Sequence, residues 1–235
     1  MSEVLNGSNR GVRLASHGAA VVASLLVNGL GVALMRLASL GTEPFTCLNY
    51  SVAEGLGLPL AVPMIAVSAV LLAMSAVFLR SAIGFGTAAN VILLGVFADL
   101  WQGWLAGMGV DAATLVTGDY LFQRLALMLV GMALMVIGSA FYMSADLGMS
   151  PYDALGYVVE RLTGGRVTFR WARMAADACC VAVAFTVASA RGTEWELVGI
   201  GTLVMVFGIG PLLSWLIGHV ARPAYAALDR ALGAS

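Results

Sequence analysis

Ionisable residues inside long apolar runs are the first candidates for chemistry in this chain. Asp99 stands in one such run, and Arg173 and Asp177 stand four residues apart in another. Residues four apart share one face of a helix and can pair. A charge at the centre of a bilayer costs at least about 2.5–3.5 kcal/mol, so such residues usually face protein or water. For Arg173 and Asp177 we therefore weigh a gating or ion-coupling pair against a salt bridge that only holds its helix in place.

Asp99 and two asparagines are further polar residues in these runs. Asp99 has no arginine within one helical turn, so it either carries a proton or is solvated near the outer end of its helix. Asn49 and Asn90 either line a polar path or form helix–helix hydrogen bonds.

Pro44 and Pro151 follow a leucine–glycine pair at the same distance, in LGTEP (40–44) and LGMSP (147–151). Proline fits the first turn of a helix, because that turn needs no N–H donor. Ser150 fits the N-cap of the second helix, and Asp153 fits its capping acid. We expect short helices at 45–55 and 152–162, each roughly 17 Å long, which is half a bilayer.

The sequence leaves two arrangements of these short helices open. They can enter the membrane from opposite faces as half-helices whose N-termini point at a central site, where free N–H groups and the helix dipole attract anions. They can instead lie flat at the two interfaces. The charged residues near their C-terminal ends, Glu54, Glu160 and Arg161, fit either arrangement.

A second glycine motif, GFGT (84–87) and GIGT (199–202), begins two of the apolar runs. Thr87 and Thr202 can cap the helices that start there. No strand pattern precedes either motif, so neither is a dinucleotide-binding fingerprint. We expect tight turns and close helix contacts at both places.

The elements that must position these residues are apolar helices. The chain has 235 residues, 60 % hydrophobic and 11 % charged, and its mean hydropathy is +0.93. A soluble domain carries roughly 25 % charged residues and cannot bury so much apolar surface. The predicted fold class is therefore an all-α polytopic membrane protein. Six runs are long enough to span a bilayer: 18–38, 58–79, 85–107, 121–143, 167–189 and 197–220.

The two halves of the chain resemble each other. Residues 38–50 and 145–157 share six of 13 positions, and residues 84–95 and 199–210 share five of 12. Each half holds three spanning helices, an odd number, so the second half must enter the membrane from the opposite side. We expect two inverted three-helix repeats, 18–109 and 121–220, each with one short Pro-initiated helix, as in many secondary transporters.

The arginines predict the orientation in the membrane. With the N-terminus inside, the inner segments hold nine arginines and the outer segments three. The positive-inside rule then places both termini in the cytoplasm of a bacterial plasma membrane. Outside the repeats lie a cytoplasmic N-terminal segment (1–17), an outer connection (110–120) and a cytoplasmic tail (221–235). His17, just before the first run, is expected to be solvated.

Several function classes lack the residues they need. HExxH, GxSxG and Walker motifs are absent, so we expect no enzyme and no catalytic residues. Three cysteines without a repeated spacing predict neither a disulfide framework nor a metal site, and no cofactor is expected. A net charge of −1 without a basic block argues against nucleic-acid binding.

The chain resembles the YitT/YczE-like family of bacterial integral membrane proteins over nearly its whole length. The resemblance rests on LGTEP, LGMSPYD (147–153), GFGTAAN (84–90) with Gly95 and Asp99, Arg173 with Asp177, and GIGT…IGP (199–211). One departure is Thr46, where the family commonly has an acid. The resemblance implies a multi-pass membrane protein for which transport is assumed, without a substrate class.

We expect a carrier for a small solute or ion that rocks one repeat against the other. The alternative is a membrane accessory or scaffold protein that transports nothing. The expected partners are the lipid bilayer and a small-molecule or ion substrate. A second copy of the chain joins them if the GxxxG match at 103–107 packs between subunits rather than within the fold. The residues expected along the substrate path are Pro44, Asn49, Thr87, Asn90, Asp99, Ser150, Pro151, Asp153, Arg173, Asp177 and Thr202.

Overall fold

The computed structural model describes residues 2–110, 112–117 and 120–232, and every regular element among them is a helix. Six helical segments are long and apolar enough to cross a membrane: Gly11–Ala38, Ala61–Phe78, Phe85–Gly107, Leu121–Ser144, Phe169–Ser189 and Trp195–Ala231. Each overlaps one of the six predicted runs. The all-α class is therefore confirmed for the described residues, and the six helices long and apolar enough to span a membrane match the six predicted runs.

The first and last of these segments extend beyond their apolar runs. α1 (Ser2–Ala38) begins inside the predicted N-terminal segment. α10 (Ile200–Leu216) continues through a π-helix, η2 (Ile217–Ala221), into α11 (Arg222–Ala231), which forms most of the predicted tail. Of the predicted outer connection, Ala112–Thr117 forms α5. Residues 1, 111, 118–119 and 233–235, which belong to these predicted segments, lie outside the described residues.

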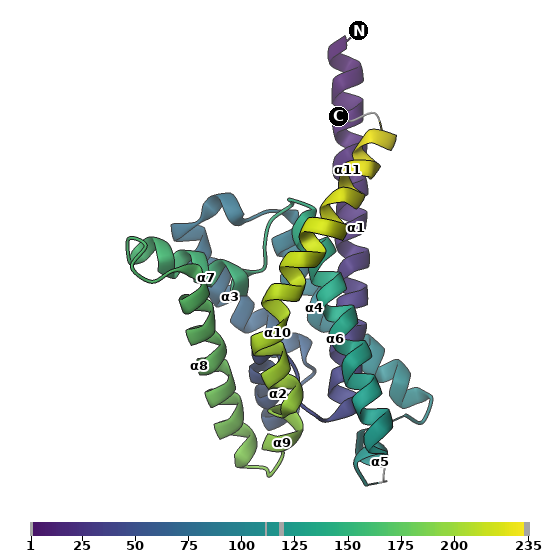
Figure 1. The fold of residues 1–235 in the computed structure, drawn as a ribbon, viewed down its shortest axis with the longest axis vertical. Helices are drawn as coiled ribbons and strands as arrows, with labels where there is room; N and C mark the ends of the chain where they lie inside the picture. Colours follow the sequence, from purple (N-terminus) through teal and green to yellow (C-terminus); the bar gives the residue numbers. More distant parts are fainter. Residues whose placement is uncertain (1, 111, 118–119, 233–235) are drawn as a thin grey trace.

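α1 and α6 (Leu121–Ser144) run antiparallel to each other (Figure 1). Glycines let them approach closely: a Cβ on Gly31 would lie 2.6 Å from the carbonyl oxygen of Gly131, and a Cβ on Gly138 would lie 2.8 Å from that of Ser24. Gly31 and Gly138 are 107 positions apart, as are Ser24 and Gly131. This is also the spacing between the two leucine–glycine motifs, so the helix crossing follows the same sequence repeat.

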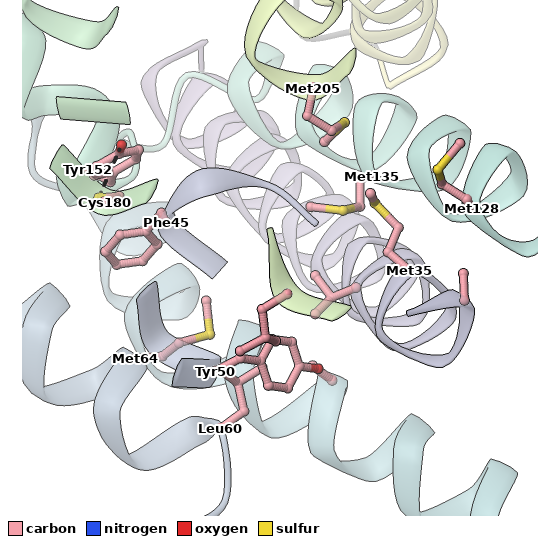
Figure 2. Packing of buried hydrophobic residues seen from close by; sticks show 14 of the residues in the cluster. Met35, Phe45, Tyr50, Leu60, Met64, Met128, Met135, Tyr152, Cys180 and Met205 are labelled. Atoms are coloured by element: carbon pink, nitrogen blue, oxygen red, sulfur yellow. Dashed lines mark hydrogen bonds between the residues drawn. The ribbon is translucent and has the colours of Figure 1, made fainter. Parts of the chain in front are cut away.

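Methionine side chains fill much of the space beside this crossing. Figure 2 shows Met35 of α1 and Met135 of α6 facing each other. Met128 and Met205 belong to the same buried cluster, and none of the four is more than 5 % exposed. The unbranched, polarizable methionine side chain adapts to irregular gaps, which suits a contact between helices of different tilt.

The two short helices begin at the predicted prolines. They are α2 (Pro44–Leu56) and α7 (Pro151–Leu162). α2 packs against α8 (Phe169–Ser189), and α7 packs against α3 (Ala61–Phe78), so each short helix contacts a long helix of the other half. Ser150 caps α7 as predicted, since its hydroxyl accepts a hydrogen bond from Tyr152 N at 3.3 Å.

The leucine–glycine turn before each short helix bonds to the glycine turn of the opposite half. Leu40 O accepts a hydrogen bond from Gly201 N at 2.8 Å, at the start of α10. Leu147 O accepts one from Gly86 N at 2.7 Å, at the start of α4 (Phe85–Gly107). The contact therefore occurs twice, with the roles of the halves exchanged.

Gly41 and Gly148 are the glycines that these two turns require. Their φ angles are +95° and +109°, which side chains rarely adopt. A Cβ on Gly41 would lie 2.5 Å from Gly199 N, and a Cβ on Gly148 would lie 2.5 Å from Thr87 Oγ1. Both the backbone conformation and the close approach therefore exclude other residues.

Candidate functional site

Arg173 of α8 lies among three carboxylates. Its Nε is 3.2 Å from Asp177 Oδ1, its Nη1 contacts Asp153 Oδ1, and its Nη2 is 3.6 Å from Glu43 Oε1. The structure thus brings the expected partners Arg173 and Asp177 together, and it adds Asp153, which was expected as a cap. Glu43 comes from the first half of the chain, whereas the other three residues come from the second half.

Two aromatic rings join the start of α2 to the start of α7. Phe45 and Tyr152 stack with their ring centroids 4.6 Å apart (Figure 2). The guanidinium carbon of Arg173 lies 4.2 Å from the centroid of the Tyr152 ring, within the range of a cation–π interaction. The Tyr152 hydroxyl donates a hydrogen bond to Asp177 Oδ1 at 2.6 Å. The N-terminal turns of the two short helices therefore meet at Arg173. We call Glu43, Tyr152, Asp153, Arg173 and Asp177 the Arg173 cluster.

Glu43 is the member of this cluster that the sequence analysis missed. It is the N-cap of α2, and its Oε2 accepts hydrogen bonds from the backbone N and the hydroxyl of Thr46, both at 2.9 Å. An acid directly before Pro44, with Thr46 two residues further on, is a pattern that could have indicated this cap. Thr46 stands where the family commonly has an acid, and Glu43 supplies a carboxylate three residues earlier.

Carboxylates outnumber cations in the Arg173 cluster. The side chains of Glu43, Asp177 and Asp153 are 12, 11 and 25 % exposed, and that of Arg173 is 22 % exposed. The N-termini of α2 and α7 add roughly half a positive charge each. If all three acids were ionised, about one negative charge would remain uncompensated. Such a charge is costly where water is scarce.

A second ion-pair cluster, the Arg36 cluster, lies at the C-terminal ends of α1, α2 and α8. Arg36 Nη2 is 2.5 Å from Glu54 Oε1, and Arg36 Nη1 is 3.5 Å from Glu196 Oε2. Arg191 Nη2 is 3.1 Å from Glu54 Oε2. Two arginines face two glutamates, so the charges of this cluster balance. The sequence analysis placed the arginines on the outer side but did not identify the cluster.

Asp99 holds the start of α3. Its Oδ1 accepts a hydrogen bond from Leu60 N at 3.0 Å, and its Oδ2 accepts one from Ala61 N at 2.8 Å. These N–H groups have no partner within their own helix, because they belong to its first turn. Among the described residues, Asp99 pairs with no arginine. The carboxylate therefore acts as a cap supplied by another helix.

Thr87 and Thr202 serve the glycine turns at the starts of α4 and α10. Thr87 Oγ1 donates to Ala82 O at 3.2 Å, and Thr202 Oγ1 donates to Leu197 O at 3.3 Å. Ala82 ends the short 3-10 helix η1 (Arg80–Ala82), and Leu197 ends α9 (Glu194–Leu197). Both threonines thus tie the preceding short helix to the long one, the structural use that the motif predicted.

The two asparagines lie on different helices. Asn49 is fully buried in α2, its Nδ2 donates to Phe45 O at 2.7 Å, and its Oδ1 has no hydrogen-bond partner among the described residues. Asn90 lies partly buried on α4. Among the described residues, neither side chain bonds to a member of the Arg173 cluster.

His17 is buried, so the expectation that it is solvated is wrong. Its Nδ1 is 3.1 Å from Ala145 O and its Nε2 is 2.9 Å from Asp229 Oδ1. Arg13 also pairs with Asp229, at 3.0 Å. Both ring nitrogens of His17 therefore lie within hydrogen-bond distance of an oxygen atom. This contact holds α11 against α1, with Tyr225 of α11 packed on the His17 ring.

Comparison with known proteins identifies a family and three bacterial relatives. Residues 16–218 match a family described as a family of unknown function (DUF6198). Three bacterial relatives each align over 85 % of this chain. "Uncharacterized membrane protein YczE" of Bacillus subtilis (strain 168) is 27 % identical, over 88 % of its own length. "Uncharacterized protein YyaS" of the same organism is 26 % identical over 89 % of its length, and an "Uncharacterized protein" of Haemophilus influenzae is 25 % identical over 82 %.

No solved structure matches the chain. The family match includes both short helices and every member of the Arg173 cluster. The chain therefore belongs to this family of YczE-like bacterial membrane proteins.

Proposed function

We propose that this protein is a carrier that moves a small solute or ion across a bacterial plasma membrane. It works as two inverted repeats, each of three spanning helices and one short helix, which rock against each other around a shared site. The antiparallel pairing of α1 and α6 supports this arrangement, because the first helices of the two halves then enter from opposite faces. The exchanged contacts of the two leucine–glycine turns support it as well.

The observation that carries the proposal is the position of Arg173 between acids of both halves. Glu43 belongs to the first half, and Asp153 and Asp177 belong to the second. The stacking of Phe45 on Tyr152 favours half-helices that enter from opposite faces. Helices lying flat at the two interfaces would be separated by a hydrocarbon core of about 30 Å, so their first turns could not meet.

The two ion-pair clusters offer contacts that rocking can break one set at a time. Glu43 and Arg173 join the halves in the first turns of α8. The pairs Arg191–Glu54 and Arg36–Glu196 join them beyond its other end. Parting one set opens the space between the short helices to one side of the membrane, while the other set keeps it closed. In the proposed cycle, the occluded state is the one in which both sets are formed.

The orientation is part of the proposal. Nine of the 12 arginines lie on the side of the chain ends, which favours a cytoplasmic location for α11 and the start of α1. The Arg173 cluster then lies toward the cytoplasm and the Arg36 cluster toward the outside. Single cysteines at exposed loop positions, labelled with a membrane-impermeant reagent in intact cells, would test this, and labelling of α11 from outside would refute it.

The Arg173 cluster favours a cation, or a neutral solute moved with protons, over an anion. The short-helix N-termini could attract an anion, but their first turns already hold Glu43 and Asp153. Arg173 is engaged by the acids, so an anion would meet carboxylates without a free cation. Among the described residues, no three His, Cys, Asp or Glu side chains are arranged to hold a metal ion. We therefore favour a proton or an organic solute.

Flux measurements in proteoliposomes test the carrier function. A panel of cationic, neutral and anionic solutes is offered to the wild type and to the variants Asp177→Asn and Arg173→Ala. Arg166→Ala removes an exposed arginine and serves as the matched control. We expect flux of at least one solute in the wild type and the control, and its loss in the other two variants.

Two outcomes would contradict the proposal. Equal flux in all four proteins would refute the role of the Arg173 cluster. Absence of flux for every solute, together with a protein that co-purifies stably, would support the alternative of an accessory protein that transports nothing.

A further inference from the structure

We infer that Glu43 binds a proton in the closed structure, and that uptake and release of this proton couple the carrier to the proton gradient. The inference rests on the proposed function and adds its coupling ion. Three features of the geometry support it: the position of Glu43 between the halves, the excess of acids around Arg173, and a carboxylate oxygen of Glu43 that accepts no hydrogen bond from the described residues.

α2 provides an internal comparison, because it has a glutamate at each end in opposite charge settings. Glu54 contacts two arginines, Arg36 and Arg191. Glu43 shares its single arginine with two aspartates. After the helix N-termini are counted, about one negative charge remains at the Glu43 end. One bound proton removes it.

Both aspartates accept hydrogen bonds from Arg173. Asp177 Oδ1 accepts from Arg173 Nε at 3.2 Å and from the Tyr152 hydroxyl at 2.6 Å. Asp153 Oδ1 accepts from Arg173 Nη1. Hydrogen bonds from a cation or a hydroxyl to a carboxylate favour its charged form. The proton therefore belongs on the third acid.

Glu43 has room for the proton. Its Oε2 accepts both hydrogen bonds from Thr46. Within the described part of the chain, its Oε1 has only the 3.6 Å contact with Arg173, which is longer than a hydrogen bond. Oε1 can therefore carry the proton while Oε2 keeps its bonds. The hydroxyl of the neighbouring Thr42, 1 % exposed, also lacks a partner among the described residues. The closed structure thus leaves polar groups of this turn unused.

The groups that face Glu43 explain how the proton acts on the two halves. Among the described groups that face Glu43, Arg173 supplies the one positive charge. Loss of the proton from Glu43 therefore leaves a negative charge, which water can solvate only when the two halves part. The proton reaches Glu43 from water on the outer side while the Arg36 cluster is parted and the Arg173 cluster is formed, and it returns to cytoplasmic water when the Arg173 cluster parts. The facing titratable groups are Cys47 on α2, Tyr152 and Asp153 on α7, and Arg173, Asp177 and Cys180 on α8.

Infrared spectroscopy of the protein in lipid, without any solute, detects this proton directly. A protonated carboxyl group absorbs apart from carboxylates, and ¹³C labelling of glutamate side chains shifts the band of a glutamic acid but not that of an aspartic acid. Near neutral pH we expect the band of one protonated glutamic acid in the wild type. The band should be lost in Glu43→Gln and kept in Glu54→Gln, the matched control on the same helix.

The result separates this inference from the carrier function. If the labelled wild type shows no protonated glutamic acid, or if the band persists in Glu43→Gln, the inference is overturned, while solute flux would leave the carrier function standing. The labelled wild type carries the first test even if Glu43→Gln fails to fold. In proteoliposomes, wild-type flux should follow a pH difference across the membrane, and flux of the exposed-arginine control Arg166→Ala should follow it too. Flux in the wild type that ignores the pH difference would also overturn the inference.

Discussion

The exchanged turns at Gly41 and Gly148 allow a quantitative prediction for substitution by alanine. Each glycine has a positive φ, and a Cβ at either position would lie 2.5 Å from an atom of the opposite half. Strain of this kind costs about 1–3 kcal/mol. Displacing closely packed atoms costs a further 1–3 kcal/mol or so. We therefore expect Gly41→Ala and Gly148→Ala each to lower the free energy of unfolding by about 2–6 kcal/mol.

Substitutions at two other glycines distinguish the cost of backbone strain from the cost of displacing closely packed atoms. Gly57 has a φ of +65°, but a Cβ there would have nothing within 4 Å. Gly57→Ala therefore adds strain alone, at about 1–2 kcal/mol. Gly103 is helical and open, so Gly103→Ala should stabilise the helix by about 0.5–1 kcal/mol.

Equilibrium unfolding in mixed micelles, with a denaturing detergent as the variable, gives the free energies of all four variants. The expected order of stability is Gly103→Ala, then Gly57→Ala, then the two turn variants. If Gly41→Ala lost no more stability than Gly57→Ala, the close approach of the Gly41 turn to the glycine turn of the other half would be refuted.

Three further predictions concern the charged residues. Asp99→Ala should lower the free energy of unfolding by about 0.5–2 kcal/mol, because α3 loses its cap. Asp99→Asn should retain solute flux. Loss of flux in a stable Asp99→Asn protein would show that the carboxylate does more than cap the helix. Arg173→Ala should lower the free energy of unfolding by about 3–5 kcal/mol, because it leaves buried acids unpaired. Unfolding measured at two pH values should show a smaller loss at the lower pH, because protonation of the acids removes their repulsion. A loss that does not depend on pH would contradict the charge argument. His17→Ala should speed hydrogen exchange of the α11 amides while α6 stays protected, and unchanged exchange in α11 would mean that His17 does not hold it.

The helices could be predicted because membrane-spanning segments are visible in hydropathy alone. The predicted run at 85–107 coincides with α4, and the prolines fix the starts of α2 and α7. The end of the last helix could not be found in this way. Its polar final turns continue as α11 because they pack on α1 and α6, through Tyr225 and Asp229, and hydropathy does not record that contact.

The candidate site could be predicted only in part. Arg173 and Asp177 are four residues apart on one helix, so their pairing follows from local geometry. Glu43 lies in a turn, far in sequence from its arginine, and only the fold brings the two together. The role of Asp99 was hidden for another reason: its partners are backbone N–H groups, which every residue type except proline offers.

The backbone hydrogen bond from Gly201 N to Leu40 O also constrains the order in which the molecule can assemble during its synthesis. The ribosome delivers the first turn long before the segment that satisfies its carbonyl group has been made. Until then, the Leu40 carbonyl needs another hydrogen-bond donor, which water, the insertion machinery or a non-native contact of the chain must supply. The first half therefore cannot complete its native hydrogen bonds before the segment around Gly201 has been synthesised. Co-expression of the two halves as separate polypeptides should restore the fold only when both enter the same patch of membrane.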